Sequence, residues 1–404
     1  MQKVEVIGEV EQKRVILNSN YATAYAVRDA DVDVIAVYPI TPQTAVAEKL
    51  SEFIANGEMD AELIHVESEH SALSALVGAA ATGARTFTST SSQGLEYMHE
   101  ILHIASGMRL PIVMAVATRA LSAPINIWND YSDLMNARDT SWITIIASSA
   151  QEVYDSIIEA YMISEDPRVL LPVAVAYDGF WMSHTYEPLY IPANREFVRK
   201  LLPKRLREVR LDPDRPLTFG SVGGPDYYAK VKAIQRRAML ESIEVIREAD
   251  SRIAKAFGRV YAPLESYMLE DAEIVVVTYG GFYGTLKSAV DAMRKEGIRV
   301  GALRIRLWRP FQGELVARAL SKASLVVVAD RALSYGAALD SPLALEILAA
   351  IYAEGYTDIR LASFAVGIGG MPVTERDFEA ITKLSLKLSR ERKVVGTIVW
   401  GGDI

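Results

Sequence analysis

Cysteine is absent from the 404 residues of this sequence. Without a thiol, the chain cannot form a disulfide, use a thiolate as a nucleophile, or hold an iron–sulfur cluster through cysteine ligands of its own. Any such redox centre must therefore belong to a partner protein.

Long hydrophobic runs and an excess of basic charge are also missing. No stretch approaches the roughly 20 apolar residues that a membrane-spanning helix needs, and the N-terminal segment lacks the apolar stretch of an export signal. The formal net charge is −8, with acidic and basic residues interspersed, which argues against binding to a nucleic-acid backbone. We therefore expect a cytoplasmic protein with neither a membrane nor a nucleic acid as its partner.

The chain is rich enough in apolar residues to bury a large core, because 50% of its residues are hydrophobic and 23% are charged. Its length suggests two or three domains. Short apolar runs alternate with helical patterns, which predicts an α/β fold built on doubly wound parallel sheets. A long helical pattern at 226–257 separates two such halves, so we expect domains at 1–225 and 263–404 joined by a helical linker at 226–262.

The expected elements follow from the same patterns. In the first half we expect strands at 34–37, 62–66, 86–90, 111–117 and 169–176, and helices at about 21–31, 42–55, 72–81, 95–106 and from 149. In the second half we expect strands at 273–278, 300–307, 325–329 and 359–366, with helices between them. The stretch 121–139 loses its periodicity, and loops of this length inside a compact domain are usually functional.

The stretch 38–44 ends the first expected strand. Its two prolines fix φ and predict a rigid, non-helical elbow at Ile40 and Thr41. The spacing predicts Thr41 as the N-cap of the next helix and Pro42 as its first residue. Because open α/β sheets bind ligands beyond the carboxyl ends of their strands, Thr41 is equally a candidate to contact a ligand.

Two other patterns carry weaker predictions. His99 to His103 read His-Glu-Ile-Leu-His, the spacing of a zinc hydrolase, but the other three histidines supply no characteristic third ligand. A helix whose histidines pack or face solvent is the alternative. The glycine-rich turns at 280–284 and 367–370 could cradle phosphate, although tight packing of helix against strand explains them better.

Five residues lie at or just after the ends of expected strands: Thr41, Glu69, Ser92, Gln93 and Arg119. In a parallel sheet these positions converge. An arginine there suits a substrate carboxylate, which it can bind through two parallel hydrogen bonds. A glutamate at such an edge can have a raised pKa and exchange protons with a nitrogen heterocycle.

Each of these two roles has a structural alternative. Arg119 could instead form an ion pair with Asp130 or Asp133. Glu69 could be an acidic residue in the first turn of a helix, where the helix dipole stabilises its charge.

Motifs along nearly the whole chain resemble the alpha subunits of the pyruvate:ferredoxin oxidoreductases, a branch of the 2-oxoacid:ferredoxin oxidoreductase family. They lie at 38–42, 66–72, 92–95, 108–114, 119–130, 138–140, 308–311, 334–336 and 366–370. The resemblance implies a thiamine diphosphate pyrimidine-binding domain followed by a transketolase C-terminal-like domain. These two units fit the two α/β halves.

The resemblance also implies roles for single residues. Thr41 would bond the bound 2-oxoacid, Arg119 would grip its carboxylate, and Glu69 would meet the aminopyrimidine ring. The backbone at Pro39 and Ile40 would lie near the same ring. We count Ser92 and Gln93 with these cofactor-binding candidates.

Partner subunits would supply what this chain lacks. The chain has no Gly-Asp-Gly followed by an Asn-Asn pair, so Mg²⁺ and the diphosphate of the cofactor should bind a beta subunit, and no metal ligand is expected here. Beta and delta subunits would carry [4Fe-4S] clusters, and a gamma subunit would complete the complex.

The expected reaction is oxidative decarboxylation of pyruvate with coenzyme A to acetyl-CoA and CO2, with ferredoxin reduced. The alternatives are branched-chain 2-oxoacids such as 2-oxoisovalerate as substrates, a non-catalytic assembly subunit, and the zinc hydrolase.

Overall fold

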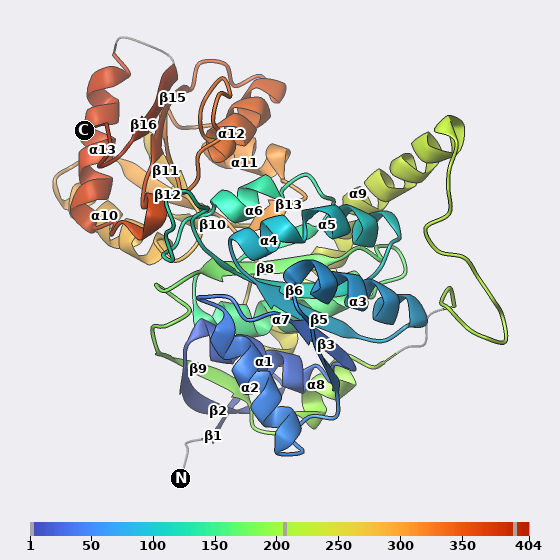
Figure 1. Cartoon of the computed structure of the whole chain (residues 1–404). Helices are drawn as coiled ribbons and strands as arrows, with labels where there is room; N and C mark the ends of the chain where they lie inside the picture. The colour runs from blue at the N-terminus through green and yellow to red at the C-terminus, as the bar shows by residue number, and fades with distance from the viewer. Residues whose placement is uncertain (1–3, 205–207, 391–393, 404) are drawn as a thin grey trace.

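The computed structural model describes residues 4–204, 208–390 and 394–403 of the chain. Its strands form three sheets, and Figure 1 shows the two larger ones flanked by helices. The larger has seven strands in the spatial order β13 (Leu307–Arg309), β7 (Ile143–Ile146), β8 (Val173–Asp178), β6 (Ile112–Thr118), β5 (Thr86–Thr90), β3 (Val34–Val37) and β4 (Glu62–His65). All of its neighbours pair parallel except β13 with β7.

Helices cover both faces of this sheet. On one face lie α1 (Ser19–Asp29), α2 (Thr44–Ala55) and α7 (Ala150–Ser164). On the other lie α3 (Glu69–Thr82), α4 (Gln93–Tyr97), α5 (His99–Gly107) and α6 (Ser132–Asn136). Strand β6 illustrates why two covers are needed: its odd-numbered residues from Val113 to Ala117 belong to the first core and its even-numbered ones from Ile112 to Val116 to the second.

The second sheet has six strands, and all but its edge strand β10 run parallel. Their order is β10 (Leu264–Tyr267), β12 (Val300–Ile305), β11 (Ile274–Thr278), β14 (Leu325–Asp330), β15 (Arg360–Ala365) and β16 (Val394–Val399). Its helices are α10 (Tyr283–Lys295) and α13 (Glu375–Leu388) on one face, and α11 (Gly313–Leu320) and α12 (Pro342–Ala353) on the other, with the short 3-10 turn Ile368–Gly370 after β15. These parallel sheets confirm the expected α/β class.

A small antiparallel sheet completes the architecture, with β2 (Val10–Leu17) between β1 (Val4–Ile7) and β9 (Glu187–Pro192). The short helix α8 (Glu196–Leu201) follows β9. The sequence patterns did not predict this sheet, because β2 carries an uninterrupted polar run at 11–14 and shows neither strict alternation nor a continuous apolar stretch.

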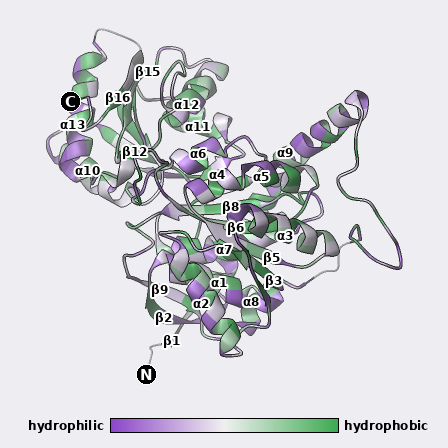
Figure 2. Ribbon diagram, viewed as in Figure 1, coloured by the Kyte–Doolittle hydropathy of each residue, from purple (hydrophilic) through white to green (hydrophobic). Residues whose placement is uncertain are grey.

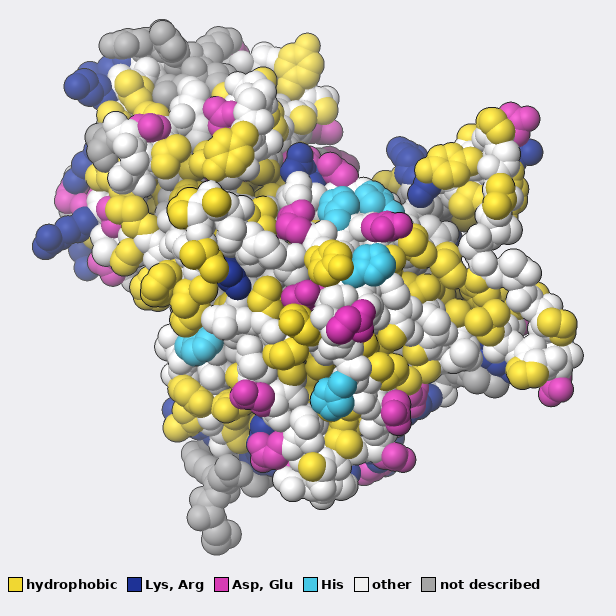
Figure 3. All heavy atoms as spheres, viewed as in Figure 1, with side chains coloured by type: hydrophobic (Ala, Val, Ile, Leu, Met, Phe, Trp, Pro, Cys, Tyr) yellow, Lys and Arg dark blue, Asp and Glu magenta, His cyan; other side chains and the backbone are white. Residues whose placement is uncertain are grey.

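Helix α9 (Pro225–Phe257) is the longest in the described chain. Its C-terminal part packs into the first core through Val245, Ile246 and Ile253. Its N-terminal turns project from the body in Figure 1, and in Figure 2 they are largely hydrophilic. Figure 3 shows apolar and basic side chains together on this projecting part, where Tyr227 and Tyr228 are exposed.

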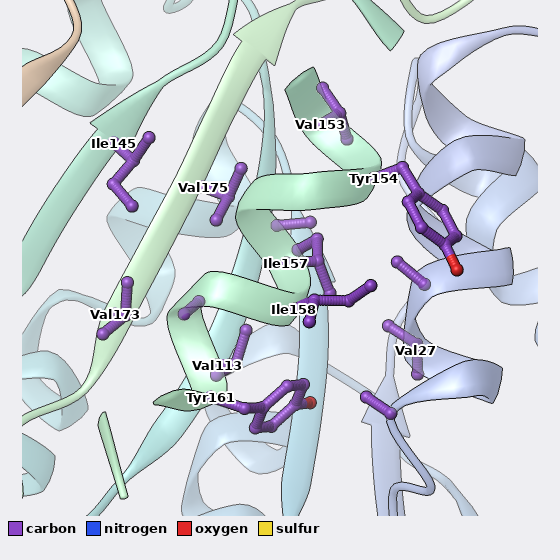
Figure 4. Packing of buried hydrophobic residues seen from close by; sticks show 14 of the residues in the cluster. Val27, Val113, Ile145, Val153, Tyr154, Ile157, Ile158, Tyr161, Val173 and Val175 are labelled. Carbon is purple, nitrogen blue, oxygen red and sulfur yellow. The ribbon is translucent and has the colours of Figure 1, made fainter. Parts of the chain in front are cut away.

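The first core also shows how a central helix is fixed to the sheet. In Figure 4, Ile157 and Ile158 of α7 lie between the strand residues and Val27 of α1. Two tyrosines of the same helix bury their rings and hydrogen-bond through their hydroxyls, Tyr154 to Asp29 at 2.7 Å and Tyr161 to the carbonyl of Thr86 at 3.1 Å. Satisfying these hydroxyls allows the large rings to be buried without an unpaired donor.

Several expected boundaries were wrong. The helix expected at 95–106 is two helices that meet at Met98, and the loop 121–139 contains α6. The strand expected at 300–307 divides after Ile305, and its last part, β13, leaves the second sheet to pair with β7 of the first. Strands β7, β10 and β16 and helix α13 were not expected at all.

Candidate functional site

The carboxyl ends of four neighbouring strands meet at one edge of the seven-stranded sheet. β4, β3, β5 and β6 pair parallel in that order, so the residues that follow them lie side by side. Parallel strands of an open sheet place their ligand sites at this edge. The predicted site residues all lie on the segments that leave it.

The elbow after β3 is held by two buried amides. The Nε2 of Gln43 donates to the carbonyls of Tyr38 (2.9 Å) and Ser89 (3.0 Å), and the Nδ2 of Asn20 donates to the carbonyl of Pro42 (2.7 Å). Pro39 is exposed and Ile40 half-buried at the start of the elbow. The expected non-helical elbow is therefore confirmed, and side chains from α1 and from the N-cap of α2 fix its position.

The predicted capping role of Thr41 was wrong. Helix α2 begins at Thr44 with Gln43 at the N-cap position, because the Gln43 N–H first closes a turn onto the carbonyl of Ile40 at 2.9 Å. Neither Thr41 nor Pro42 is inside the helix. The exposed side chain of Thr41 is thus available to a ligand.

Arg119 lies beside Thr41. Its Nη1 donates to the carbonyl of Thr41 at 3.0 Å, and its Nε donates to the carbonyl of Asn126 at 2.9 Å. No salt bridge to this guanidinium occurs among the described residues. Asp133 accepts the backbone N–H of Arg119 instead (3.0 Å), so the alternative, an ion pair with Asp130 or Asp133, is not formed in the described part of the chain.

Burial shapes the electrostatics of this arginine. Arg119 is 7% exposed, and desolvation lowers its pKa below the usual range of arginine, although the group remains charged at neutral pH. A buried cation bonded only to neutral carbonyls attracts an anion. A substrate carboxylate fits this arrangement.

Ser92 links the ends of β5 and β6. Its φ of 49° lies in the left-handed region, which serine rarely adopts. Asp133 accepts the backbone N–H of Ser92 at 2.8 Å, while the Ser92 hydroxyl lies 2.6 Å from both the carbonyl of Ala120 and Oε1 of Gln93. The hydroxyl of Ser92 and the amide of Gln93 therefore brace the edge next to Arg119.

Glu69 begins α3 and is 6% exposed. Burial raises the pKa of its carboxyl, against a smaller opposing effect of a backbone hydrogen bond. No side chain in the described residues hydrogen-bonds this carboxyl. The carboxyl of Glu69 has room because residue 94 is a glycine. A Cβ on Gly94 would lie 2.5 Å from both Oε1 of Glu69 and Oγ1 of Thr90.

This environment suits a heterocyclic nitrogen. A buried carboxyl with a raised pKa can hydrogen-bond a ring nitrogen and share a proton with it. Glu69 also lies in the first turn of α3, which Ser68 caps by accepting the N–H of Ser71. This position matches the alternative prediction that the helix dipole stabilises the charge of Glu69. The two roles are compatible.

The histidine pair does not form a metal site. His99 and His103 lie on α5 with ring centroids 5.2 Å apart, and nowhere in the described residues do three His, Cys, Asp or Glu side chains converge as metal ligands. Figure 3 shows several histidines spread over the face of the molecule in view. The zinc interpretation thus lacks a third ligand within the part of the chain that the structure describes.

Five polar residues position the site in ways that the sequence did not predict: Asn20, Gln43, Asn126, Asn129 and Asp133. Asn126 is half-buried and the other four are buried. Of the five, only Asp133 was considered from the sequence, as an ion-pair partner of Arg119. All are polar side chains that bond backbone groups of distant segments. Short polar residues within a loop give no periodic signal. Only the loss of periodicity across 121–139 indicated where three of them would lie.

None of the helices in the described residues is long and apolar enough to cross a bilayer.

Two family models match the chain. Residues 25–251 match the thiamine diphosphate-binding domain of pyruvate flavodoxin/ferredoxin oxidoreductase, and residues 272–378 match core domain II of pyruvate:ferredoxin oxidoreductase. The first contains every predicted site residue. The second covers most of the six-stranded sheet and its helices.

Curated proteins match over nearly the whole length. Pyruvate synthase subunit PorA of Pyrococcus furiosus is 45% identical over 96% of this chain and 98% of its own length, and that of Methanocaldococcus jannaschii is 49% identical over 91% and 93%. Ketoisovalerate oxidoreductase subunit VorA of Pyrococcus horikoshii is 41% identical over 95% and 97%.

Solved structures agree on the fold. A 2-oxoglutarate:ferredoxin oxidoreductase from Magnetococcus marinus superposes with a TM-score of 0.71 at 17% identity, covering 93% of this chain and 65% of that one. A split-gene transketolase superposes with a TM-score of 0.56 at 13% identity. These two likenesses concern fold alone, whereas the family models and the PorA relatives show that the chain belongs to the pyruvate flavodoxin/ferredoxin oxidoreductase family.

Proposed function

We propose that this chain is the alpha subunit of a heteromeric pyruvate:ferredoxin oxidoreductase. The complex converts pyruvate and coenzyme A to acetyl-CoA and CO2 and passes two electrons to ferredoxin. The observation that carries the proposal is the Arg119 guanidinium, buried at the sheet edge and bonded to the carbonyl of Thr41. Similarity to pyruvate synthase subunits supports pyruvate over other 2-oxoacids.

Arg119 and Thr41 bind the substrate in this proposal. The Nε and Nη1 atoms of Arg119 hold the elbow and the loop, and Nη2 has no hydrogen bond to a described residue. Nη2 is therefore free to donate to the substrate carboxylate. The Thr41 hydroxyl reaches the same substrate from the elbow.

Glu69 binds the pyrimidine ring of thiamine diphosphate. When bound, this cofactor would supply a nucleophilic thiazolium carbon and an electron sink for decarboxylation of a 2-oxoacid. Glu69 holds a proton against a ring nitrogen, and the rise in its pKa caused by burial favours that role. Pro39, Ile40, Ser92 and Gln93 would hold the same end of the cofactor.

A beta subunit completes the site. The edge carries exposed apolar side chains, among them Tyr97, Ile125, Trp128 and Trp181, and exposed apolar groups of this kind mark surfaces that a partner covers. The beta subunit would hold Mg²⁺ and the diphosphate, and beta and delta subunits would hold the [4Fe-4S] clusters that a chain without cysteine cannot bind. A gamma subunit, coenzyme A and ferredoxin complete the set of partners, in the cytoplasm.

The proposed domains keep the limits 1–225 and 263–404, with 226–262 as the helical linker between a pyrimidine-binding-like and a transketolase C-terminal-like domain. The pairing of β13 with β7 adds a direct connection between the two.

A branched-chain 2-oxoacid is the second candidate substrate, because ketoisovalerate oxidoreductase subunits are also similar to this chain. A non-catalytic assembly role explains the buried Arg119 less well, since assembly needs no carbonyl-bound guanidinium at a sheet edge.

The test is a substrate panel on the complex reconstituted with its partner subunits. Pyruvate, 2-oxoisovalerate and 2-oxoglutarate are compared through coenzyme A-dependent reduction of ferredoxin or methyl viologen. We expect the highest kcat/KM with pyruvate and no turnover by this chain alone. Highest activity with 2-oxoisovalerate would select the second candidate, and activity that survives Arg119→Ala unchanged would contradict the catalytic proposal.

A further inference from the structure

The loop 119–131 that carries Arg119 is fastened to the second half of the chain. Asn126 donates from Nδ2 to the carbonyl of Gly369 at 3.0 Å, and the N–H of Gly369 donates to Asp130 at 3.1 Å. Asn126 is also the residue whose carbonyl accepts the Nε of Arg119. One asparagine thus connects the guanidinium to the turn at 367–370.

A second attachment runs through a fully buried arginine. Arg331, directly after β14, donates from Nη1 to Asp178 at 2.5 Å and from Nη2 to Oδ1 of Asn129. The Nδ2 of Asn129 donates to Oγ1 of Thr118 at 2.6 Å, and Thr118 is the residue before Arg119. The carbonyl of Arg331 accepts the N–H of Tyr131 at 2.9 Å, which fixes the far end of the loop.

Glycine makes this close approach possible. Gly370 has a φ of +83°, and a Cβ there would collide with Cβ of Trp128 and lie 3.2 Å from the N–H of Asn129. A Cβ on Gly280 would lie 2.5 Å from the Tyr131 hydroxyl and 2.8 Å from Arg331. The glycine-rich turns at 280–284 and 367–370 therefore pack closely against the loop 119–131.

We propose that the six-stranded half of the chain positions Arg119 for the substrate carboxylate, through Asn126 and Asn129 of the loop. This inference rests on the proposed substrate role of Arg119. Gly369, Gly370 and Arg331 are positioning residues in it, because they touch the loop and act through Arg119. The second half of the chain then contributes to substrate affinity by holding the loop that carries Arg119.

The experiment compares two glycines with the same backbone requirement in the reconstituted complex. Gly370→Ala introduces a Cβ against the loop, whereas Gly355→Ala, at a φ of +79°, introduces one with no atom within 4 Å. Both carry the conformational cost of alanine at positive φ. Only Gly370→Ala should raise the KM for pyruvate, by roughly tenfold, with kcat within about twofold of wild type.

A double-mutant cycle with Arg119→Ala tests the route. If Gly370 acts through Arg119, adding Gly370→Ala to Arg119→Ala should leave KM where Arg119→Ala alone put it. Amide hydrogen exchange across 121–131 should accelerate in Gly370→Ala and stay unchanged in Gly355→Ala. Asn126→Ala, which removes the link without adding an atom, should give the same result if Gly370→Ala does not assemble.

These measurements distinguish failure of this inference from failure of the proposed function. An unchanged KM in Gly370→Ala and Asn126→Ala, beside a raised KM in Arg119→Ala, would overturn the inference and leave the proposed function standing. Equal effects of Gly370→Ala with and without Arg119 would also overturn it. An unchanged KM in Arg119→Ala would overturn the proposed function itself.

Discussion

Arg119 has an unusual set of partners for a buried cation. Its side chain hydrogen-bonds two backbone carbonyls, and the nearest acid, Asp133, is occupied by the N–H groups of Ser92 and Arg119 itself. The carbonyls orient the planar fork without neutralising its charge. That leaves the charge for a ligand.

Arg119→Lys should therefore raise the KM for pyruvate by about tenfold to a hundredfold, the range of one lost hydrogen bond to a charged group. Lysine keeps the charge but cannot hold both carbonyls and still present a donor in the plane of the fork. Steady-state kinetics of the reconstituted complex measure the effect.

Arg109→Lys is the matched control. Arg109 precedes β6 at the opposite edge of the sheet and also donates to backbone carbonyls, those of Val169 and Leu170. Its replacement should affect stability but leave KM at the wild-type value. Equal KM values for Arg119→Lys and wild type would remove the carboxylate role.

Glu69→Gln tests the proton role of the carboxyl. An amide can bond a ring nitrogen but cannot hold and release a proton there, so turnover should fall by about 10² to 10⁴, a typical general acid–base factor. Because burial raises the pKa of Glu69 in the folded chain, its contribution to stability is full at low pH and is lost as the pH rises through that pKa.

The glutamine variant should consequently unfold at the same or a higher temperature than wild type at pH 8, with the difference vanishing toward pH 4. Thermal unfolding at several pH values and steady-state turnover measure the two effects. Turnover within about threefold of wild type, less than the smallest such factor, would exclude Glu69 from the chemistry.

At the scale of elements, the site depends on the close approach of α3 and α4. Glu69 stands in the first turn of α3, and Gly94 in the first turn of α4 gives it room. A Cβ there would press on Glu69 and on Thr90 of β5 at 2.5 Å each. The segments that carry Glu69, Thr90 and Gly94 therefore pack so closely that no side chain fits at position 94.

Gly94→Ala should displace the Glu69 carboxyl and lower turnover by tenfold or more, since misplacement of a reacting group by about 1 Å can cost about 10²-fold. Gly78→Ala is the control, because Gly78 lies inside α3 and a methyl group added there would meet no atom within 4 Å. Alanine there should stabilise the helix by about 0.5–1 kcal/mol and leave turnover unchanged. Equal activity of the two variants would contradict the crowding at Glu69.

The elements that the sequence predicted well are those with a local cause. Strands β3 and β5 have the expected limits, and α2 ends at Asn56 and Gly57 as expected, because buried apolar runs and a glycine with φ of +69° act locally. Convergence of Thr41, Glu69, Ser92 and Arg119 followed from parallel pairing alone.

The elements that it missed depend on tertiary context. β13 has three residues and exists only because β7 offers an edge to pair with. The side-chain amide of Gln43, at the N-cap position of α2, bonds the carbonyl of Ser89 on β5, a tertiary contact that no propensity encodes. The loop around Asn126 likewise owes its shape to Gly369 and Arg331, which lie far along the chain in the second half.

At the scale of the molecule, a buried ionic cluster joins the two larger sheets. Arg304 of β12 and Arg306, just after it, both bond Glu152 of α7, with Nη1 of Arg304 and Nε of Arg306 each at 2.8 Å. Arg306 also bonds Glu159 at 2.5 Å and Asp250 of α9 at 3.3 Å, while Arg304 reaches the half-exposed Glu265 at 3.0 Å. The four carboxyl groups of this cluster outnumber its two arginines.

Burial therefore holds a proton in the cluster. It raises the pKa of Glu159 to about 8, with a further rise from Asp250 against the lowering effect of Arg306. Glu152, facing both arginines, has its pKa lowered to about 2 despite its burial. One glutamate of α7 is thus ionised throughout the neutral range while the other shares a proton with Asp250.

Raising the pH toward about 8 should weaken the chain, because the folded state still holds this proton while the unfolded state has already released it. Because the pKa of Glu159 is raised in the folded state, its contribution to stability is full below the ordinary glutamate pKa. It declines by about 1.4 kcal/mol per pH unit for one proton between that pKa and about pH 8, and levels off above pH 8. Glu159→Gln, whose amide replaces the protonated carboxyl, should flatten this decline, as urea unfolding of the purified chain between about pH 5.5 and 9 would measure. Glu152→Gln is the matched control: it removes a carboxylate ionised at every one of these pH values, so it should lower stability throughout and leave the slope unchanged. Parallel loss of stability in wild type and Glu159→Gln would show that the proton lies elsewhere.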